Sequence, residues 1–182
     1  LGHLFSSASN AWFPYDPDTI RYILANVNSK VSREIMNILN PTLNYNAGDI
    51  TNIPIIIENR SIVEGFTKEN ISISKQDWDA HETSWDFEEN ALTFISKRLD
   101  VLKNLAEIVE QYKEEWTERF TQLHANEEEL NRQFIEIYGL QDELTPDVPL
   151  DEITILQQGE IKIEDNQIKW NNDVLMKQLI SY

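Results

Sequence analysis

The chain has 182 residues, of which 41% are hydrophobic, which is enough to bury a core and excludes a disordered tail. Its formal net charge of −17 argues against affinity for nucleic acid, because phosphate binding needs clustered lysine and arginine. The sequence contains no cysteine, which excludes disulfides, thiolate zinc sites and a cysteine nucleophile.

The sequence shows no membrane anchor and no secretion signal. No apolar run approaches the roughly 18 residues of a membrane helix, and the residues after Leu1 lack the charged region of a signal peptide. We therefore expect a soluble, cytoplasmic protein without membrane contact. Because the chain begins with Leu1 instead of methionine and stops at Tyr182 within a predicted helix, we also expect it to be a piece of a longer protein.

The acidic residues are unevenly distributed. Residues 1–57 hold three Lys/Arg against four Asp/Glu, a net charge of −1, which leaves −16 for residues 58–182. We therefore expect any DNA contact in the first part, and a solvated scaffold or protein-contacting arm in the second. The predicted division is 1–57 as a small α/β unit, 58–90 as a linker with a short helix, 91–145 as a helical arm, and 146–182 as a β-hairpin with the start of a further helix.

The sequence of residues 1–57 predicts a helix followed by a strand. Asp16 and Pro17 are typical of a helix start, and apolar residues then recur every three or four positions up to Leu39. Pro41 disfavours helical geometry at the preceding residue and ends the pattern. Residues 53–57 form an apolar run of strand length, entered through turn residues.

Within the predicted linker, we expect a short helix over residues 58–66 and an irregular segment over residues 67–90. Ser74 and Asp77 resemble a capping box, so one further helical turn is expected to carry Trp78. The tryptophans in irregular segments are equally consistent with an interface and with a core, whereas core packing is favoured for Trp116 and Trp170.

The strongest apolar periodicity begins at Leu92 and continues to Leu123, which predicts a long amphipathic helix. Asn126 then either caps a new helix that ends at Gly139, or one helix runs throughout. Beyond the prolines at 146 and 149, short strands are predicted at residues 153–155 and in a hairpin around residues 165 and 166, followed by a helix capped by Asn171 or Asn172. The predicted fold class is therefore mainly α (α+β).

The sequence lacks the usual signatures of catalysis. Its five glycines are isolated, which excludes a glycine-rich phosphate loop. His81 and Glu82 begin like a zinc-protease helix, but Trp85 stands where the second histidine is required. His124 with Glu128 is better explained as an exposed helical pair than as a metal site. We therefore predict no catalytic residue, no metal and no bound cofactor in this chain.

Three groups of residues resemble PglX-type adenine-specific DNA methyltransferases of BREX phage-defence systems and their type IIG restriction-modification relatives. The first comprises residues 27–31, 39–45 and 48–54, and is similar to the element that closes the target-recognition region. The second comprises residues 74–79 and 82–87. The third comprises residues 129–132, 137–140 and 142–146, and is similar to the helical spacer of these enzymes. Together they cover most of residues 20–150.

The resemblance implies a parent enzyme that transfers a methyl group from S-adenosylmethionine to adenine N6 after flipping the base. The residues Asn40, Pro41, Thr42 and Leu43 depart from the family's Asn-Pro-Pro-aromatic motif, and no glycine-rich loop precedes them. The chain is therefore expected to be a non-catalytic fragment that lies after the catalytic domain and contributes to DNA positioning and to domain or partner contacts.

The partners implied by the resemblance are double-stranded DNA, bound through the parent enzyme, and other phage-defence proteins. Four residues are candidates for DNA binding, namely Lys30, Arg33, Asn44 and Tyr45. For Lys30 and Arg33, simple solvation of a helix face explains the sequence equally well. The alternative function is a stand-alone acidic helical module that binds proteins and has no role with DNA.

Overall fold

The computed structural model describes residues 13–42, 47–98 and 105–181. These residues are mostly helical, with one two-stranded antiparallel hairpin, which confirms the predicted mainly α fold class. The chain forms two compact units. Unit 1 comprises Leu1–Lys68 and Glu127–Asp147, and unit 2 comprises Glu69–Asn126 and Val148–Tyr182. Each unit has its own hydrophobic core.

Unit 1 begins with a short 3-10 helix, η1 (Pro17–Thr19), in which the carboxylate of Asp16 accepts a hydrogen bond from the Asp18 N–H at 3.1 Å. It continues into α1 (Ile20–Asn28), α2 (Lys30–Leu39) and the short α3 (Ala47–Thr51). The prediction of one uninterrupted helix up to Leu39 was wrong at one residue. Ser29 has extended geometry, with φ −73° and ψ 157°, and separates α1 from α2.

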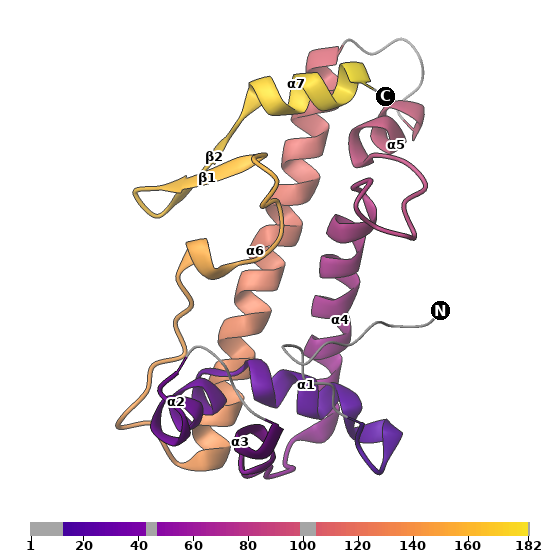
Figure 1. Ribbon diagram of the computed structural model, residues 1–182. Helices are drawn as coiled ribbons and strands as arrows, with labels where there is room; N and C mark the ends of the chain where they lie inside the picture. The colour runs from indigo at the N-terminus through magenta and orange to yellow at the C-terminus, as the bar shows by residue number, and fades with distance from the viewer. Residues whose placement is uncertain (1–12, 43–46, 99–104, 182) are drawn as a thin grey trace. The chain divides into compact units, whose positions relative to one another are not determined.

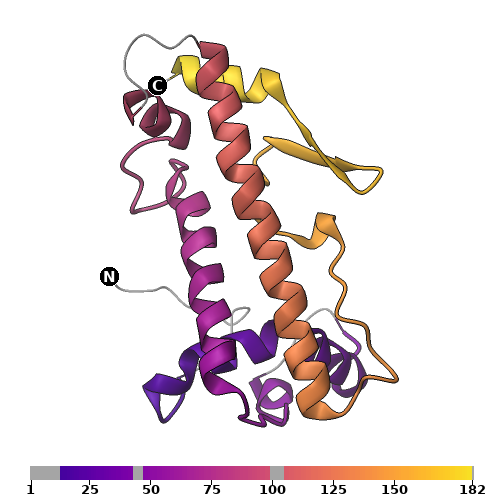
Figure 2. The same ribbon diagram turned by 180° about the vertical axis from the view of Figure 1, so that it is seen from behind.

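The core of unit 1 is built where α1 and α2 lie against the last turns of α6 (Leu105–Tyr138), as both Figure 1 and Figure 2 show. The fully buried rings of Tyr22 and Phe134 meet edge to face, with centroids 5.6 Å apart. The remaining buried members of this core are Ala25, Val31, Val63, Leu130 and Ile135. The predicted apolar stripe was therefore only partly right about the inward face. Its member Val31 is buried, but the exposed large apolar residues of these helices include four others from the stripe, namely Ile20, Leu24, Ile38 and Leu39.

The strand predicted at residues 53–57 is absent, because this segment has irregular backbone. An apolar run forms a strand only where another strand can pair with it. Here the backbone is instead bound by two tyrosine hydroxyls, from Tyr22 and Tyr138. Only Ile53 of this run is buried, whereas Ile56 and Ile57 are exposed, and the groups that bind the backbone lie far away in the sequence.

The helix α4 (Arg60–Asp79) is much longer than the helix predicted at residues 58–66, and the prediction of an irregular segment over residues 67–90 was wrong up to residue 79. Ser74 lies inside α4, so it does not begin a new helix as the capping-box prediction supposed. Val63 belongs to the core of unit 1 and Ile73 to that of unit 2. Burial in two separate cores stabilises a polar sequence in helical form, since tertiary packing supplies most helix stability.

The long periodic segment contains two helices among the described residues, α5 (Ala91–Arg98) and α6. Arg98 forms an ion pair with Glu115, whereas 17 residues of continuous helix would separate them by about 25 Å. One helix running from residue 92 to 138 is therefore contradicted. Asn126 lies in the interior of α6, so one helix does continue past it, and Gly139 follows the helix with φ +68°, as predicted for a left-handed cap.

Unit 2 packs the first part of α6 against the C-terminal segments. Its core contains Trp116, as predicted, and Trp170 packs partly buried against it. The strand predicted at residues 153–155 is wrong: Ile153 and Ile155 are buried, but they follow a 3-10 turn, η2 (Leu150–Glu152), in irregular backbone.

The predicted hairpin is confirmed as β1 (Ile161–Glu164) and β2 (Gln167–Trp170), paired in the register Ile161 to Trp170 and Ile163 to Ile168. Both turn residues, Asp165 and Asn166, have positive φ, as a two-residue hairpin turn requires. The chain continues into α7 (Asn172–Ser181), which lies beside α5 (Figure 1), and the Asn171 side chain accepts from the Val174 N–H at 3.4 Å. Within the described ranges, no helix has both the length and the apolar character that crossing a membrane requires.

Candidate functional site

Two of the four predicted DNA-contact residues, Lys30 and Arg33, lie on the first turn of α2 in unit 1. Ser29 builds this turn locally: its hydroxyl donates to the Asn26 carbonyl at 2.6 Å and accepts from the Ser32 N–H at 3.3 Å. One serine therefore ends α1 and caps α2, as serine side chains commonly do. The sequence signal was available in the Asn-Ser pair at positions 28 and 29, but the apolar spacing continues across the break and conceals it.

Lys30 is the first residue of α2, and both its backbone and its side chain contact other parts of unit 1. Its N–H donates to the Asn131 side chain at 2.9 Å, and its ammonium donates to the Thr145 carbonyl at 3.2 Å. Asn131 in turn donates to the Pro146 carbonyl at 3.2 Å. Lys30 is half-buried and therefore has a packing role beside any role of its charge.

Arg33 lies three residues further along α2 and is exposed. The structure thus brings Lys30 and Arg33 together on one helix, as the sequence predicts. Asn44 and Tyr45 lie outside the described residues. The basic character of the region is limited to these local cations, because unit 1 as a whole has six Lys/Arg and thirteen Asp/Glu, a net charge of −7.

A hydrogen-bonded network beneath these helices was not identified from the sequence. The Tyr138 hydroxyl accepts from the Asn26 amide at 3.0 Å and from the Ile56 N–H at 3.3 Å, and it donates to the Pro54 carbonyl. Asn26 has no exposed surface, and its amide oxygen accepts from the Ser32 hydroxyl at 3.1 Å. This network ties α1 and α2 to the irregular segment that follows α3.

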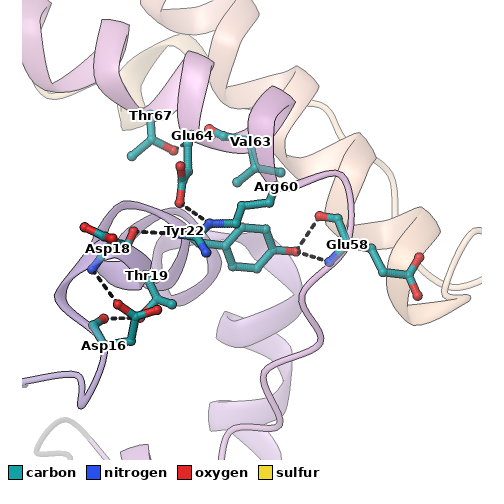
Figure 3. Close-up of polar contacts among 9 residues, drawn as sticks. All are labelled: Asp16, Asp18, Thr19, Tyr22, Glu58, Arg60, Val63, Glu64 and Thr67. Atoms are coloured by element: carbon teal, nitrogen blue, oxygen red, sulfur yellow. Dashed lines mark hydrogen bonds and ion pairs between the residues drawn. The ribbon is translucent and has the colours of Figure 1, made fainter.

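Tyr22 binds the same segment from α1 (Figure 3). Its hydroxyl lies 3.0 Å from the Glu58 carbonyl and accepts from the Glu58 N–H at 3.2 Å. It also lies 2.9 Å from the Ile56 carbonyl. Burial of the ring raises the pKa of Tyr22 above its ordinary value, so the phenol stays protonated and can donate. A phenol that is buried in this way serves as a structural anchor.

Arg60 joins the start of α4 to η1, as Figure 3 also shows. Its Nε contacts the Glu64 carboxylate at 2.7 Å, and an Nη2 donor reaches the Asp18 carbonyl at 2.7 Å. The pKa of Arg60 is raised above its ordinary value, first by the hydrogen bond to Glu64. This cation is therefore occupied within the fold, unlike a side chain directed to solvent.

Asn40, the residue that superficially begins a methyltransferase-like motif, has its side chain engaged within unit 1. Its amide nitrogen donates to the Asp49 carboxylate at 2.6 Å, and its amide oxygen accepts from the Thr42 N–H at 3.1 Å and the Thr42 hydroxyl at 2.5 Å. These contacts form an Asx turn that ends α2. The Asn-Pro pair thus performs a structural task in this position.

The principal buried ionisable group lies in unit 2. Glu160 has no exposed surface, and its Oε1 accepts from His81 Nε2 at 2.9 Å and from the Gln178 amide at 3.1 Å. Its Oε2 has no hydrogen-bond partner among the described residues. Burial by itself would raise the pKa of Glu160, but the hydrogen bonds from His81 and Gln178 outweigh burial and keep that pKa below its ordinary value.

His81 faces hydrogen-bond acceptors on both ring nitrogens, since Nδ1 lies 2.7 Å from the Asp77 carbonyl. Both acceptors are satisfied together only when both ring nitrogens carry a proton, so these contacts favour the imidazolium form. The hydrogen bond to Glu160 is the main cause of the raised pKa of His81. The 2.9 Å contact between His81 and Glu160, both buried, is a buried ion pair. Among the residues that the structure describes, no cluster of three or more His, Cys, Asp or Glu could hold a metal ion.

The sequence comparisons relate the chain to one kind of enzyme. It is 38% identical over 155 residues to "Adenine-specific methyltransferase PglX" of Lacticaseibacillus casei (strain Zhang), covering 80% of the chain and 12% of that protein. It is 31% identical over 186 residues to "Adenine-specific methyltransferase BrxX" of Escherichia coli O9:H4 (strain HS), covering 100% of the chain and 15% of that protein. No protein-family model matches the chain.

Both relatives are described as adenine-specific methyltransferases, and the similarity extends over most or all of this chain. The chain itself spans only 12% and 15% of their length, so it corresponds to one segment of such proteins. The chain is therefore homologous to a segment of PglX-type adenine-specific methyltransferases.

Proposed function

We propose that this chain is a non-catalytic segment of a site-specific DNA adenine N6-methyltransferase of a phage-defence or restriction-modification system. In this role it helps to position DNA and holds domains or partners together. The observation that carries the proposal is the similarity to two adenine-specific methyltransferases over 80% and 100% of the chain. The functional division at residues 57, 90 and 145 stays a prediction.

The chemistry of the parent enzyme is proposed to reside outside this segment. Methyl transfer to adenine N6 requires S-adenosylmethionine and a site that receives the flipped base. The five glycines of the chain are isolated, and the Asn40 side chain is engaged by Asp49 and Thr42. These observations favour a non-catalytic role for the segment. The cofactor would then be bound by another part of the parent enzyme.

DNA positioning is proposed to involve the first two turns of α2. Arg33 is exposed, and the ammonium of Lys30 contacts a neutral carbonyl, so its charge is not neutralised by that bond. Asn44 and Tyr45 follow in the same resembling segment. Because unit 1 has a net charge of −7, these residues would orient DNA that is held mainly by the rest of the parent.

The test uses the full-length parent enzyme with Lys30→Gln and Arg33→Gln, measured by DNA binding across a salt titration. Glutamine removes the charge and keeps a hydrogen-bond donor, which protects the contact to Thr145. We expect weaker binding and a salt slope that falls by about one for each lost phosphate contact. The matched control is Lys162→Gln, which removes an exposed lysine from the hairpin of unit 2.

Equal affinity and equal salt slopes for the wild type and the α2 variants would contradict a phosphate role. Thermal unfolding of each variant separates a loss of binding from a loss of fold, since Lys30 also contacts Asn131 and Thr145. If methylation of adenine by the parent is absent altogether, the proposed enzyme class fails, independently of the α2 residues.

A second candidate is an acidic helical module that binds proteins and has no role with DNA. The charge of unit 2 favours this candidate, because its nine Lys/Arg stand against nineteen Asp/Glu, a net charge of −10. Light scattering over a range of protein concentrations tests self-association. A concentration-dependent dimer whose α2 variants bind DNA normally would favour this module over DNA positioning.

A further inference from the structure

Unit 2 has a groove of about 920 Å³, formed by the second half of α4, the irregular segment 80–90, α5 and the first part of α6. All of its walls belong to the same compact unit. Neither the homology to methyltransferases nor the proposed DNA role assigns a ligand to this groove. Its lining combines two features that are rarely left to solvent together, exposed aromatic rings and an excess of carboxylates.

The aromatic feature is dominated by Trp85, whose surface is 83% exposed, with Phe94 on α5 at 53%. An indole buries more apolar area than any other side chain, and such residues are enriched where one protein anchors another. The irregular segment that carries Trp85 is well anchored: the Ser84 hydroxyl donates to Asp79 at 2.8 Å and accepts from the Asp86 N–H at 3.1 Å. The exposed indole is therefore presented by a fixed turn.

The electrostatic feature is an excess of negative charge. Two cations and five carboxylates line the groove, a net charge of −3, comprising Lys75, Arg119, Asp79, Asp86, Glu88, Glu89 and Glu115. Lys75 bridges Asp79 at 2.6 Å and Asp86 at 3.0 Å. Exposed Glu88 takes part in no ion pair among the described residues. The groove therefore attracts further cations and repels acidic segments.

One lining residue of the groove, Arg119, shows how the guanidinium of a partner's arginine could bind there. The guanidinium of Arg119 lies 4.9 Å from the ring centroid of Trp116 and 3.7 Å from the Glu115 carboxylate. Stacking on an aromatic face together with a carboxylate contact suits the planar guanidinium better than an ammonium. Trp85 and Glu88 also line the groove and are exposed, so an aromatic ring and a carboxylate are available there to an incoming guanidinium.

We propose that this groove docks an arginine-bearing peptide segment of a separate protein partner, with arginine on the Trp85 ring and adjacent apolar residues against Phe94. Charge complementarity selects this occupant. Nucleic acid is disfavoured by the carboxylates, and a second copy of this acidic chain is disfavoured for the same reason. The binding does not depend on DNA positioning, so the two proposals can fail separately.

The test titrates the full chain with a labelled peptide made of three Gly-Arg-Leu repeats and measures fluorescence anisotropy. The comparison peptides replace every arginine with lysine or with glutamate. We expect the arginine peptide to bind most tightly, the lysine peptide more weakly and the glutamate peptide not at all. Binding should weaken with salt, as expected for exposed charges.

Two pairs of variants make the test specific to the groove. Trp85→Ala should weaken binding about tenfold, whereas Trp78→Ala should change it less than about twofold. Trp78 is a matched control because it is also exposed, at 56%, but does not line the groove. Glu88→Gln should weaken binding about two- to threefold and reduce the salt dependence, whereas exposed Glu82→Gln outside the groove should not.

Equal effects of the two tryptophan variants would overturn the proposal, and so would binding of the glutamate peptide as tight as that of the arginine peptide. The absence of binding of the arginine peptide up to about 1 mM would also overturn it. Hydroxyl-radical footprinting of the parent enzyme tests the source of the occupant. Protection of Trp85 before any partner is added would place the occupant in the same polypeptide and overturn docking of a separate protein.

Discussion

His81 Nε2 lies 2.9 Å from the Oε1 atom of Glu160, a carboxylate with no exposed surface. The two residues are 79 positions apart in the sequence and meet only through the packing of unit 2. The titratable groups that face the pair are Asp77 and Tyr112, and Gln178 donates to the same carboxylate oxygen. The relationship makes the stability of unit 2 dependent on pH.

The first prediction concerns the alkaline side of that dependence. The pKa of His81 is raised in the folded state, so its stabilising contribution is complete below about pH 6.5 and is lost as pH rises through the folded pKa. We expect the urea midpoint of unfolding to fall over that range. The decline should be absent in His81→Gln, and an identical decline in that variant would contradict the assignment.

On the acidic side, the pKa of Glu160 is lowered in the folded state, so its contribution is complete above about pH 4.5 and is lost as pH falls through the folded pKa. Burial raises the pKa of Asp77, so Asp77 acts in the opposite direction. The contribution of the pair is therefore expected to be largest between about pH 4.5 and 6.5. Urea unfolding from pH 3 to 6 measures this limb.

The second prediction is that Glu160→Gln destabilises the chain by about 3–5 kcal/mol near pH 6, because it leaves the His81 charge buried without its partner. Chemical denaturation measures the change. Glu164→Gln is the matched control, since Glu164 is an exposed carboxylate at the end of β1, the strand that begins directly after Glu160, and its partner is Lys169. A similar small effect for both variants would show that the buried pair contributes no more than a surface pair.

The third prediction concerns the tyrosine anchor of unit 1. Tyr22→Phe removes one hydroxyl and leaves the backbone groups of Ile56 and Glu58 without that partner, so we expect a loss of about 1–3 kcal/mol. Tyr15→Phe, at a fully exposed position, should change the free energy of unfolding by less than about 0.5 kcal/mol. Hydrogen exchange should show faster opening of residues 54–58 in Tyr22→Phe alone.

The fourth prediction uses two glycines that should respond with opposite sign. Gly65→Ala lies in the interior of α4 with nothing within 4 Å of the added methyl group, so it should stabilise the helix by about 0.5–1 kcal/mol. Gly139→Ala has equal space but φ +68°, so it should destabilise by about 1 kcal/mol. Thermal unfolding measures both, and a stabilising Gly139→Ala would contradict the left-handed cap.

Local chemistry made several elements predictable. Alternating apolar residues around Asp165 and Asn166 determine a hairpin because both residues tolerate positive φ. Gly139 ends α6 because it accepts the left-handed conformation without a steric penalty. The spacing of three and four residues from residue 105 onward determines α6 and its buried face. Each of these features depends on residues that are close together in the sequence.

The wrong predictions share a dependence on distant partners. Residues 53–57 carry strand-forming side chains, but the groups that bind their backbone are the hydroxyls of Tyr22 and Tyr138. Residues 67–79 are polar enough to indicate a linker, yet Ile73 enters the core of unit 2 and stabilises them as helix. Arg98 of α5 meets Glu115 of α6, although 17 positions separate them in the sequence.

The candidate sites divide in the same way. The sequence by itself determined that Lys30 and Arg33 share a helix, because they are three residues apart in a periodic segment, and its resembling segments indicated the family. Only the tertiary structure decided that Lys30 reaches Thr145, that Glu160 is buried against His81, and that exposed Trp85 lines the same groove as five carboxylates. The physical reason is that burial and electrostatic environment are set by residues from distant parts of the chain, which spacing along the sequence does not encode.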